Sequence, residues 1–339
     1  MSGQGVGAVE LIVGMGILTA AAVALFRRPP VAGVVAFMVF GVLVSILWGL
    51  AGAPDVALAE AAIGTGVTGA LLIEAATTSR RVTRPGTRAR AAGAGTAGRG
   101  APSYPLLVWA LGVAVAVGVT FAAVTAAART ASDPPGLGEP VRANLWASGV
   151  SNPVTGVLLN YRSYDTLLEI AVLLVAVVVL ASLRAPGGVH REPPKGTALG
   201  PVVGTIVRAV GPVLLLIAAW LLFAGSSRPG GAFQAGAVVA AVLILFDLAG
   251  VRPLRGGMPA RLAEVFGLTA FLALAALGLT LTGGWLQLEP GWAGAAIVAL
   301  ESILAAAIGA NLAAMFDAIR AVRPMPADPE AHDDVRAAP

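Results

Sequence analysis

The sequence contains no cysteine and only two histidines among its 339 residues. Without cysteine, the chain has no disulfide, no thiolate metal ligand and no cysteine nucleophile. The histidines, His190 and His332, lie in polar segments and have no partner at a spacing typical of metal ligands, so we expect solvated loop residues. The sequence therefore predicts neither a metal nor a cofactor on this chain.

Charged residues are also scarce. They make up 12% of the chain, against roughly 25% in an ordinary soluble domain, while 57% of the residues are hydrophobic and the mean hydropathy is +0.85. This composition predicts an all-α integral membrane protein that crosses the lipid bilayer several times. The pI of about 10.3 does not indicate a nucleic-acid partner, because the arginines cluster in short loops between apolar runs.

Apolar runs of about 18 to 25 residues, the length that crosses roughly 30 Å of hydrocarbon, predict nine transmembrane helices. The predicted spans are 6–26, 31–50, 55–77, 105–128, 166–183, 206–224, 232–250, 264–283 and 292–315. With the N-terminus outside and the C-terminus inside, 18 of the 22 Lys and Arg residues fall on the inner side. Loops rich in Lys and Arg stay cytoplasmic, so this asymmetry favours that orientation.

Two polar segments rich in glycine or proline divide the spans into blocks of three, two and four. Residues 78–104 carry arginine, glycine and alanine without any acid, and a second joint follows the fifth span. The predicted organisation is a three-span domain (1–77), a linker (78–104), a two-span domain (105–184), a linker (185–205), a four-span domain (206–323) and a polar tail (324–339).

Carboxylates within the predicted spans are the candidate functional residues, because an ionisable group inside a bilayer costs about 2.5 to 3.5 kcal/mol on insertion scales. Asp55 and Glu60 begin the third span, and Glu60 lies about 7.5 Å further along the helix axis. Asp55 follows Pro54, so a helix-start acid that complements the helix dipole is an alternative explanation. Glu60 is the stronger candidate for ion or proton handling.

The last block carries a second deep carboxylate. Glu301 lies about nine residues, or some 13 Å, into the final span, close to the bilayer midplane. Gly294 and Gly309 on the same helix would let another helix pack closely. Asp247 lies near the inner end of its span, where pairing with Arg252 and Arg255 would explain it. Glu74, near another span end, is a secondary candidate.

Glycines before the seventh predicted span form another notable segment. Arg228-Pro-Gly-Gly directly precedes the apolar helix, and its glycines allow tight backbone turns. Free amides at the start of that helix could hold an anion, although a tight connection between two helices also explains the pattern.

The outer loop between the fourth and fifth spans, 129–164, concentrates polar residues. Asp165 and Thr166 can cap the fifth span, and Glu169 lies one turn inside it. Arg162 can reach Asp165 or Glu169 if the turn folds back. An ion pair at a membrane entrance and simple capping are both open explanations for Asp165, and Glu169 is a further candidate for the ion path.

Three stretches resemble one known family. PDVALAEAAIGTGVTGALL (54–72) resembles the small membrane domain at the C-terminal end of the A subunit of Mrp-type multisubunit Na⁺/H⁺ antiporters, which is a separate subunit in energy-converting membrane-bound hydrogenases. VSNPVTGVLLNYRSYDTLLEIAVLLVAVVVLASL (150–183) is similar to the block that follows it. SSRPGGAFQAGAVVAAVLILFDLAG (226–250) is similar to the glycine-rich segment of the four-span antiporter B subunit.

This resemblance implies a fusion of the A-subunit tail with the B subunit, acting in a larger complex related to the membrane arm of respiratory complex I. It also implies a cation or proton path over Asp55, Glu60, Asp165 and Glu169. The large proton-pumping domain of the A subunit, with its membrane lysines, is absent here, so the implied partners are other antiporter subunits that contain it. Where the A subunit usually has Gln and then Glu, this chain has Glu60 and Gly64, which is closer to the hydrogenase type.

The leading functional hypothesis is therefore a subunit of a cation/proton antiporter in the inner cell membrane, which exchanges Na⁺ and H⁺ without covalent catalysis. Carboxylates suit both ions, because their oxygens are hard ligands and burial in general favours the protonated form. A membrane-arm subunit of a hydrogenase or related oxidoreductase complex is the alternative. A structural scaffold within either complex, whose acids only pair with neighbours, is the third hypothesis.

Overall fold

The structure is a computed structural model, and it describes residues 7–27, 29–82, 136–182, 201–250 and 258–321, with six further positions between 114 and 125. Every regular element in these ranges is helical, which confirms the all-α class. The elements are α1 (Ala8–Phe26), α2 (Pro30–Leu50), α3 (Pro54–Ala59), η1 (Glu60–Val67), α4 (Thr68–Val82), α7 (Gly138–Asn144), η2 (Leu145–Ser148), α8 (Pro153–Gly156), η3 (Val157–Tyr161), α9 (Ser163–Ser182), α10 (Pro201–Ala224), α11 (Ala232–Leu248), α12 (Met258–Thr282) and α13 (Pro290–Ala321).

The chain is a multi-pass membrane protein. Within the described ranges, seven helices are long and apolar enough to cross a bilayer, and α11, with 17 residues, is a shorter apolar helix. Each of these eight helices coincides with a predicted span to within a few residues at most ends. The predicted span 105–128 lies outside the described residues apart from isolated positions.

Helix starts follow the positions of proline. Pro30, Pro54 and Pro290 are each the first residue of a helix, where the missing N–H removes no hydrogen bond and the fixed φ angle suits the helix. At α9 the capping prediction was wrong for Thr166. The helix already begins at Ser163, and the Thr166 hydroxyl donates to the carbonyl oxygen of Leu158 (2.8 Å) because the preceding segment folds back as η3.

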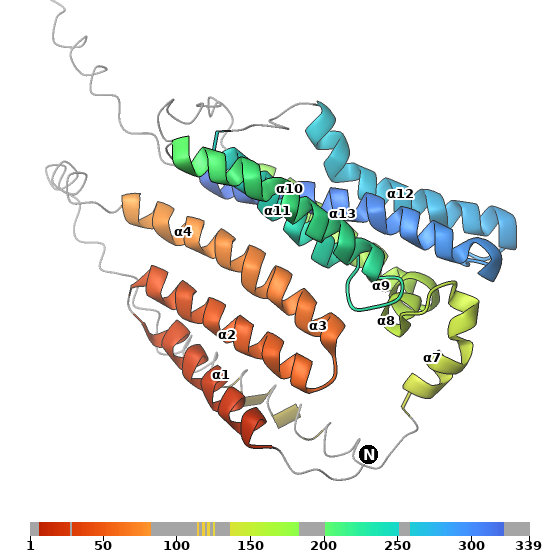
Figure 1. The fold of residues 1–339 in the computed structure, drawn as a ribbon, viewed down its shortest axis with the longest axis horizontal. Coiled ribbons are helices and arrows are strands. Elements are labelled where there is room, and N and C mark those ends of the chain that lie inside the picture. Colours follow the sequence, from red (N-terminus) through yellow and green to blue (C-terminus); the bar gives the residue numbers. More distant parts are fainter. Residues whose placement is uncertain are drawn as a thin grey trace, which may run out of the picture. The chain divides into compact units, whose positions relative to one another are not determined.

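The first three apolar segments form one layer in which α1 packs on α2, and α2 packs on the continuous helix α3–η1–α4 (Figure 1). The middle part of that helix, η1, is a π-helix with wider turns. Two side-chain hydroxyls donate hydrogen bonds to backbone oxygens of the α3–η1–α4 helix. Ser45 of α2 donates to the carbonyl oxygen of Ala57 (2.6 Å), and Thr68 donates to that of Ile63 (2.8 Å). Within this layer, α2 is therefore joined to the α3–η1–α4 helix by one side-chain hydrogen bond as well as by apolar packing.

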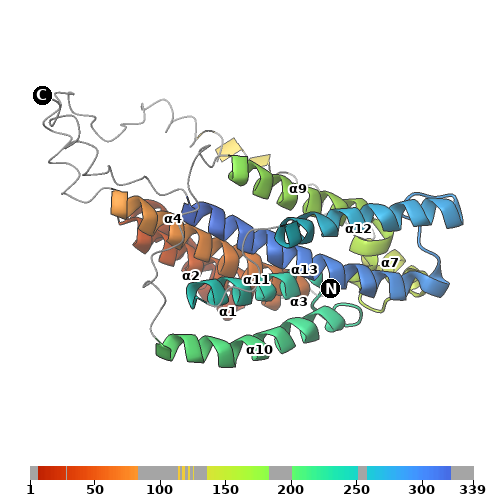
Figure 2. The same ribbon diagram turned by 90° about the horizontal axis from the view of Figure 1, so that it is seen from above.

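The 32-residue helix α13 is the core element of the last block (Figure 2). It packs against α11, α12, α9 and α4, and its side chains Ile297, Leu304 and Ile308 are almost fully buried. Gly309 lies against Val239 of α11, so the prediction that this glycine permits close helix packing is confirmed. Gly294 approaches the backbone of Gly149, which belongs to a turn rather than to a helix. Helices of the first and last blocks thus share contacts through α13 and α11.

The chain divides into two compact units, Met1–Val82 with Leu145–Pro339, and Thr83–Asn144. Helix α7 belongs to the second unit, and all the contacts described below lie in the first. The predicted outer loop 129–164 is largely helical from residue 138 onward, because α7, η2, α8 and η3 follow one another there.

Candidate functional site

Asp55 is the point at which three distant parts of the chain meet. Pro54 starts α3 and places Asp55 in its first turn. The Asp55 Oδ1 atom accepts a hydrogen bond from the Asn152 side-chain nitrogen (3.3 Å) and one from the backbone N–H of Gly230 (3.3 Å). Asp55 therefore receives donors from the segment before α8 and from the turn before α11, in addition to its place at a helix start.

The two loops that supply these donors are also bonded to each other. The carbonyl oxygen of Ser226 accepts from the backbone N–H groups of Ser151 (2.9 Å) and Asn152 (3.0 Å), and the Thr155 hydroxyl donates to the carbonyl oxygen of Gly225 (2.6 Å). Asn152 is 4% exposed, and its side-chain oxygen caps α8. These bonds fix the segment around residues 225–231 against the segment around residues 151–155.

Glu301 lies beside the next residues of the same turn. Gly231 has φ 119° and ψ −172°, a conformation that is essentially restricted to glycine, and it directly precedes α11. The backbone N–H of Ala232 hydrogen-bonds to the carboxyl group of Glu301. Free amides and the positive end of the helix dipole stabilise an anion at this place. The Ala232 amide at the start of α11 thus binds a carboxylate of the chain itself.

Glu301 is 4% exposed, and its Oε2 atom has no hydrogen-bond partner in the described part of the chain. Gln234, in the first turn of α11, is 7% exposed and donates from its side-chain nitrogen to the backbone oxygen of Asp55 (3.4 Å). Asp55 and Glu301 are therefore held by neighbouring residues of a single turn, although they come from the first and the last membrane blocks.

Glu60 is half-buried at the start of η1. Its carboxyl group lies over Gly64, one turn further on, where any side chain larger than hydrogen would collide with it. Its Oε1 atom also faces Gly41 of α2, 3.3 Å from the place where a Cβ atom would stand, and the Thr65 hydroxyl lies against the same glycine. Thr65 is 6% exposed, and its hydroxyl has no partner among the described residues. Gly64 and Gly41 together make room for the Glu60 carboxylate.

The acids of the second block lie apart from this group. Arg162 pairs with Asp165 at 2.8 Å, as predicted, but the two side chains are 68% and 37% exposed. Glu169 lies on the exposed side of α9. Within the described ranges, no hydrogen bond or ion pair joins Asp165 or Glu169 to Asp55, Glu60 or Glu301.

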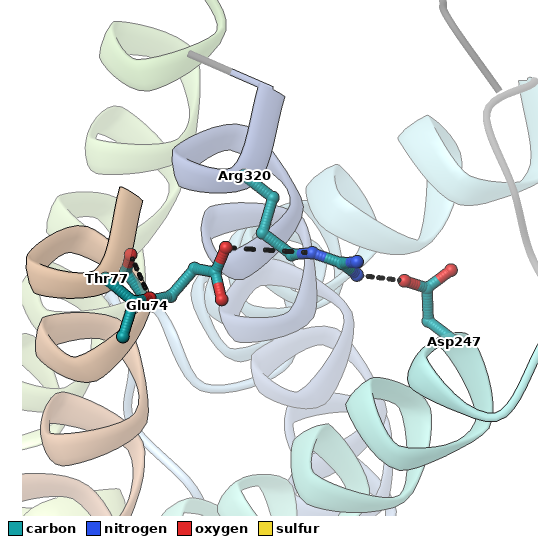
Figure 3. A network of polar contacts seen from close by, with 4 residues as sticks. All are labelled: Glu74, Thr77, Asp247 and Arg320. Carbon is teal, nitrogen blue, oxygen red and sulfur yellow. Dashed lines mark hydrogen bonds and ion pairs between the residues drawn. The ribbon is translucent and has the colours of Figure 1, made fainter. Parts of the chain in front are cut away.

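A further polar cluster joins α4, α11 and α13 (Figure 3). The Nη1 atom of Arg320 lies 2.7 Å from Oδ2 of Asp247, and its Nε atom lies 3.9 Å from Oε1 of Glu74. The guanidinium group also stacks over the ring of Phe316, 5.7 Å from its centre. These side chains are 11% to 21% exposed in the two ion pairs, so α4, α11 and α13 are joined by a partly buried cation.

Arg320 is a partner of Asp247 that the sequence did not predict. The predicted pairing with Arg252 and Arg255 stays a prediction, because both arginines lie outside the described residues. From the sequence, Arg320 contributed only to the predicted membrane orientation. The contacts of Asn152, Gln234 and Thr65 were not predicted. The signal for Arg320 was its helical spacing from Phe316, because residues four apart lie on one face of a continuing helix.

Fold and site define the chain as an all-helical, multi-pass membrane protein with carboxylates buried between its helices. Two protein families match the chain. The MbhD family, which is named after a component of the MBH complex, matches residues 15–81, and the family described as "Domain related to MnhB subunit of Na+/H+ antiporter" matches residues 202–319. The chain thus joins a segment that matches the MbhD family to a segment that matches the MnhB-related family.

Two solved structures share this fold. A chain of the Mrp complex from Dietzia sp. DQ12-45-1b is 21% identical, with a TM-score of 0.71 over 96% of this chain. A chain of the membrane-bound sulfane sulfur reductase, an archaeal respiratory membrane complex, is 23% identical, with a TM-score of 0.51 over 62% of this chain and 97% of its own length. The present chain spans 36% of the length of the Dietzia chain. The comparison with curated proteins gave no match.

Proposed function

We propose that this protein is a membrane subunit of a multisubunit monovalent cation/proton antiporter, in which it contributes buried carboxylates to the path of Na⁺ or H⁺. The observation that carries the proposal is the presence of both family domains, residues 15–81 and 202–319, in one chain. Transport of ions needs no covalent step, so we assign the protein to transporters rather than to enzymes. The proposed location is the inner cell membrane.

The proposed topology keeps nine spans, with the N-terminus outside and the C-terminus inside. Its support is the distribution of Lys and Arg residues together with the eight apolar helices described above. The proposed domain organisation remains a three-span domain (1–77), a two-span domain (105–184) and a four-span domain (206–323), joined by linkers.

Among the candidate residues, Glu301 has the strongest physical support. Its carboxyl group is only 4% exposed, so burial favours either its protonated form or its ionised form together with a cation. Asp55 and Glu60 precede it in the proposed path, since Asp55 shares the Gly230–Ala232 turn with Glu301 and Glu60 continues the Asp55 helix. The second block and the inner helix ends supply the remaining proposed residues, which are Asp165 and Glu169 with Glu74, Arg162 and Asp247 as secondary candidates.

Partner subunits would supply the proton current. No lysine occurs in any span of this chain, and the chain corresponds to about a third of the Dietzia chain that shares its fold. We therefore propose large proton-pumping subunits of the same complex as its main partners.

The test is Na⁺/H⁺ exchange in inverted membrane vesicles that carry the whole gene cluster, at matched levels of assembled complex. Glu301→Gln and Glu60→Gln should each abolish or strongly reduce exchange, because glutamine keeps the shape of the side chain but cannot carry a proton or balance a cation. Glu289→Gln is the matched control, since Glu289 is exposed just before α13. Full exchange in both buried variants, with the complex assembled, would contradict the proposed path and favour a scaffold.

A redox-driven complex is the second candidate function. The match of residues 15–81 to the MbhD family favours it, and the residues at positions 60 and 64, Glu and Gly, are closer to the hydrogenase type, as the resemblance implies. In that case the protein would lie in the membrane arm of a hydrogenase or related oxidoreductase complex. Wild-type vesicles would then show no exchange with an imposed ion gradient alone and would require an electron donor.

A further inference from the structure

Two side-chain oxygen atoms face the side of Gly231 on which other residues carry a Cβ atom. A Cβ atom built on this glycine would stand 2.9 Å from Oε1 of Glu301 and 3.6 Å from Oε1 of Gln234. Among the described residues, and apart from the two chain neighbours of the glycine, no other heavy atom comes within 4 Å of that point. The space left by the missing side chain is thus bordered by a carboxylate oxygen and an amide oxygen.

The two side chains are oriented by bonds on their other atoms. Gln234 uses its side-chain nitrogen on the backbone oxygen of Asp55, which leaves its oxygen on the side of Gly231. The N–H of Ala232 holds the Glu301 carboxyl group at the start of α11. Asp55 itself accepts from Gly230 and Asn152. Neighbouring elements therefore hold both oxygens in place instead of leaving them on mobile side chains.

A single positive charge would neutralise the ionised Glu301 carboxylate. Glu301 is 4% exposed, its Oε2 atom has no hydrogen-bond partner in the described part of the chain, and the Ala232 amide offsets only part of the cost of burying its ionised form. A monovalent cation would neutralise it. A divalent cation in proteins usually takes six or more oxygen ligands with several carboxylates, and no group of three or more potential metal ligands occurs in the described ranges.

We propose that Glu301, Gln234 and the side of Gly231 that lacks a Cβ atom form a binding site for one monovalent cation, with Na⁺ as the test ion. This inference rests on the proposed function, because it assigns the cation of that function to a defined place between α11 and α13. Glu301 supplies the charge and Gln234 supplies a neutral oxygen ligand. The glycine supplies the space, which any side chain at position 231 would reduce.

The site lies one residue away from the amide that binds Asp55. The backbone N–H of Gly230 donates to Asp55, and that of Ala232 donates to Glu301. Gly231, which borders the site, lies between these two donors in the chain. Because Gln234 also bonds to Asp55, an ion that draws the Gln234 oxygen inward pulls on the start of α3. Occupancy of the site is thereby coupled to the helix that carries Glu60.

The experiment is equilibrium binding of ²²Na⁺ to the purified whole complex in detergent, without any ion gradient and with choline chloride keeping ionic strength constant. Glu301→Gln should remove one bound Na⁺ per complex. Gln234→Leu should raise the dissociation constant of that ion by about tenfold, which corresponds to the loss of one ligand. Glu289→Gln should bind as the wild type does, because its carboxylate is exposed.

A Glu301→Gln complex that binds as many Na⁺ ions as the wild type, with equal affinity, would overturn the proposal, as would a wild-type complex that binds none. Unchanged affinity in Gln234→Leu would overturn the assignment of Gln234 as a ligand. Vesicles that lack exchange while the complex shows Glu301-dependent binding would reject the proposed function and keep the site. Normal exchange with Glu301-independent binding would do the reverse.

Discussion

Two arginine–aspartate pairs of almost equal length provide a sharp test of the contribution of burial in this fold. Arg320 and Asp247 lie 2.7 Å apart with side chains 21% and 11% exposed, whereas Arg162 and Asp165 lie 2.8 Å apart with side chains 68% and 37% exposed. The perturbations are Arg320→Met and Arg162→Met, which keep a long apolar side chain and remove the charge.

The expected magnitudes differ because the surroundings differ. Two unit charges 4 Å apart interact by about 1 kcal/mol in water and by about 4 kcal/mol at an effective dielectric constant of 20. Exposed pairs contribute about 0.2 to 1 kcal/mol in measurements, and breaking a buried pair costs about 3 to 5 kcal/mol. Because Arg320 keeps some exposure, we expect a loss of about 2 to 4 kcal/mol for Arg320→Met. For Arg162→Met we expect less than about 1 kcal/mol.

The assay is a thermal melt of the purified complex in detergent, with wild type and variants at equal concentration. At about 2 °C per kcal/mol for a chain of this size, Arg320→Met should lower the midpoint by about 4 to 8 °C, and Arg162→Met by no more than about 2 °C. Adding Asp247→Leu to Arg320→Met should restore part of the loss, since the aspartate charge that Arg320 had paired is then gone. Equal midpoints for the two single variants would refute the reasoning.

Three further changes test other contacts by the same melt. Asn152→Ala should cost about 2 to 4 kcal/mol, because it removes a helix cap and the bond to the Asp55 carboxylate; a shift no larger than that of an exposed substitution would contradict the junction described here. Gly309→Leu should destabilise by about 1 to 3 kcal/mol through overpacking between α11 and α13, whereas Gly204→Ala, which meets no atom within 4 Å, should be neutral or slightly stabilising. Thr65→Val should leave the midpoint unchanged or raise it, because the buried hydroxyl lacks a partner among the described residues, and a clear drop would reveal a partner for it.

The sequence predicted the helical class and the positions of eight apolar helices because hydrophobic runs of membrane length are a strong local signal. It also pointed to the three stretches that meet at Asp55. What it did not predict is how these stretches meet. The bonds from Asn152 and Gly230 to one carboxylate join residues that are far apart in the chain, and no local periodicity encodes such a junction.

Local capping rules failed where tertiary contacts supplied a different partner. Thr166 donates into η3 instead of capping its helix, and Asp247 pairs with Arg320, which comes from another helix. Glu301 was recognised from its depth in the last span, but its place at the start of α11 required the packing of α11 on α13. The roles proposed for Asp55, Glu60, Asp165, Glu169 and Glu301 in ion transport stay predictions.

The π-helical segment η1 changes how positions on the third span must be compared between proteins. Each residue added to a turn rotates the helix before it by about 100° relative to the helix after it. A helical wheel drawn through residues 54–82 as one regular α-helix would therefore misplace Asp55 relative to Glu74. Positions before η1 and positions after η1 therefore need to be aligned separately when this helix is compared with that of another protein.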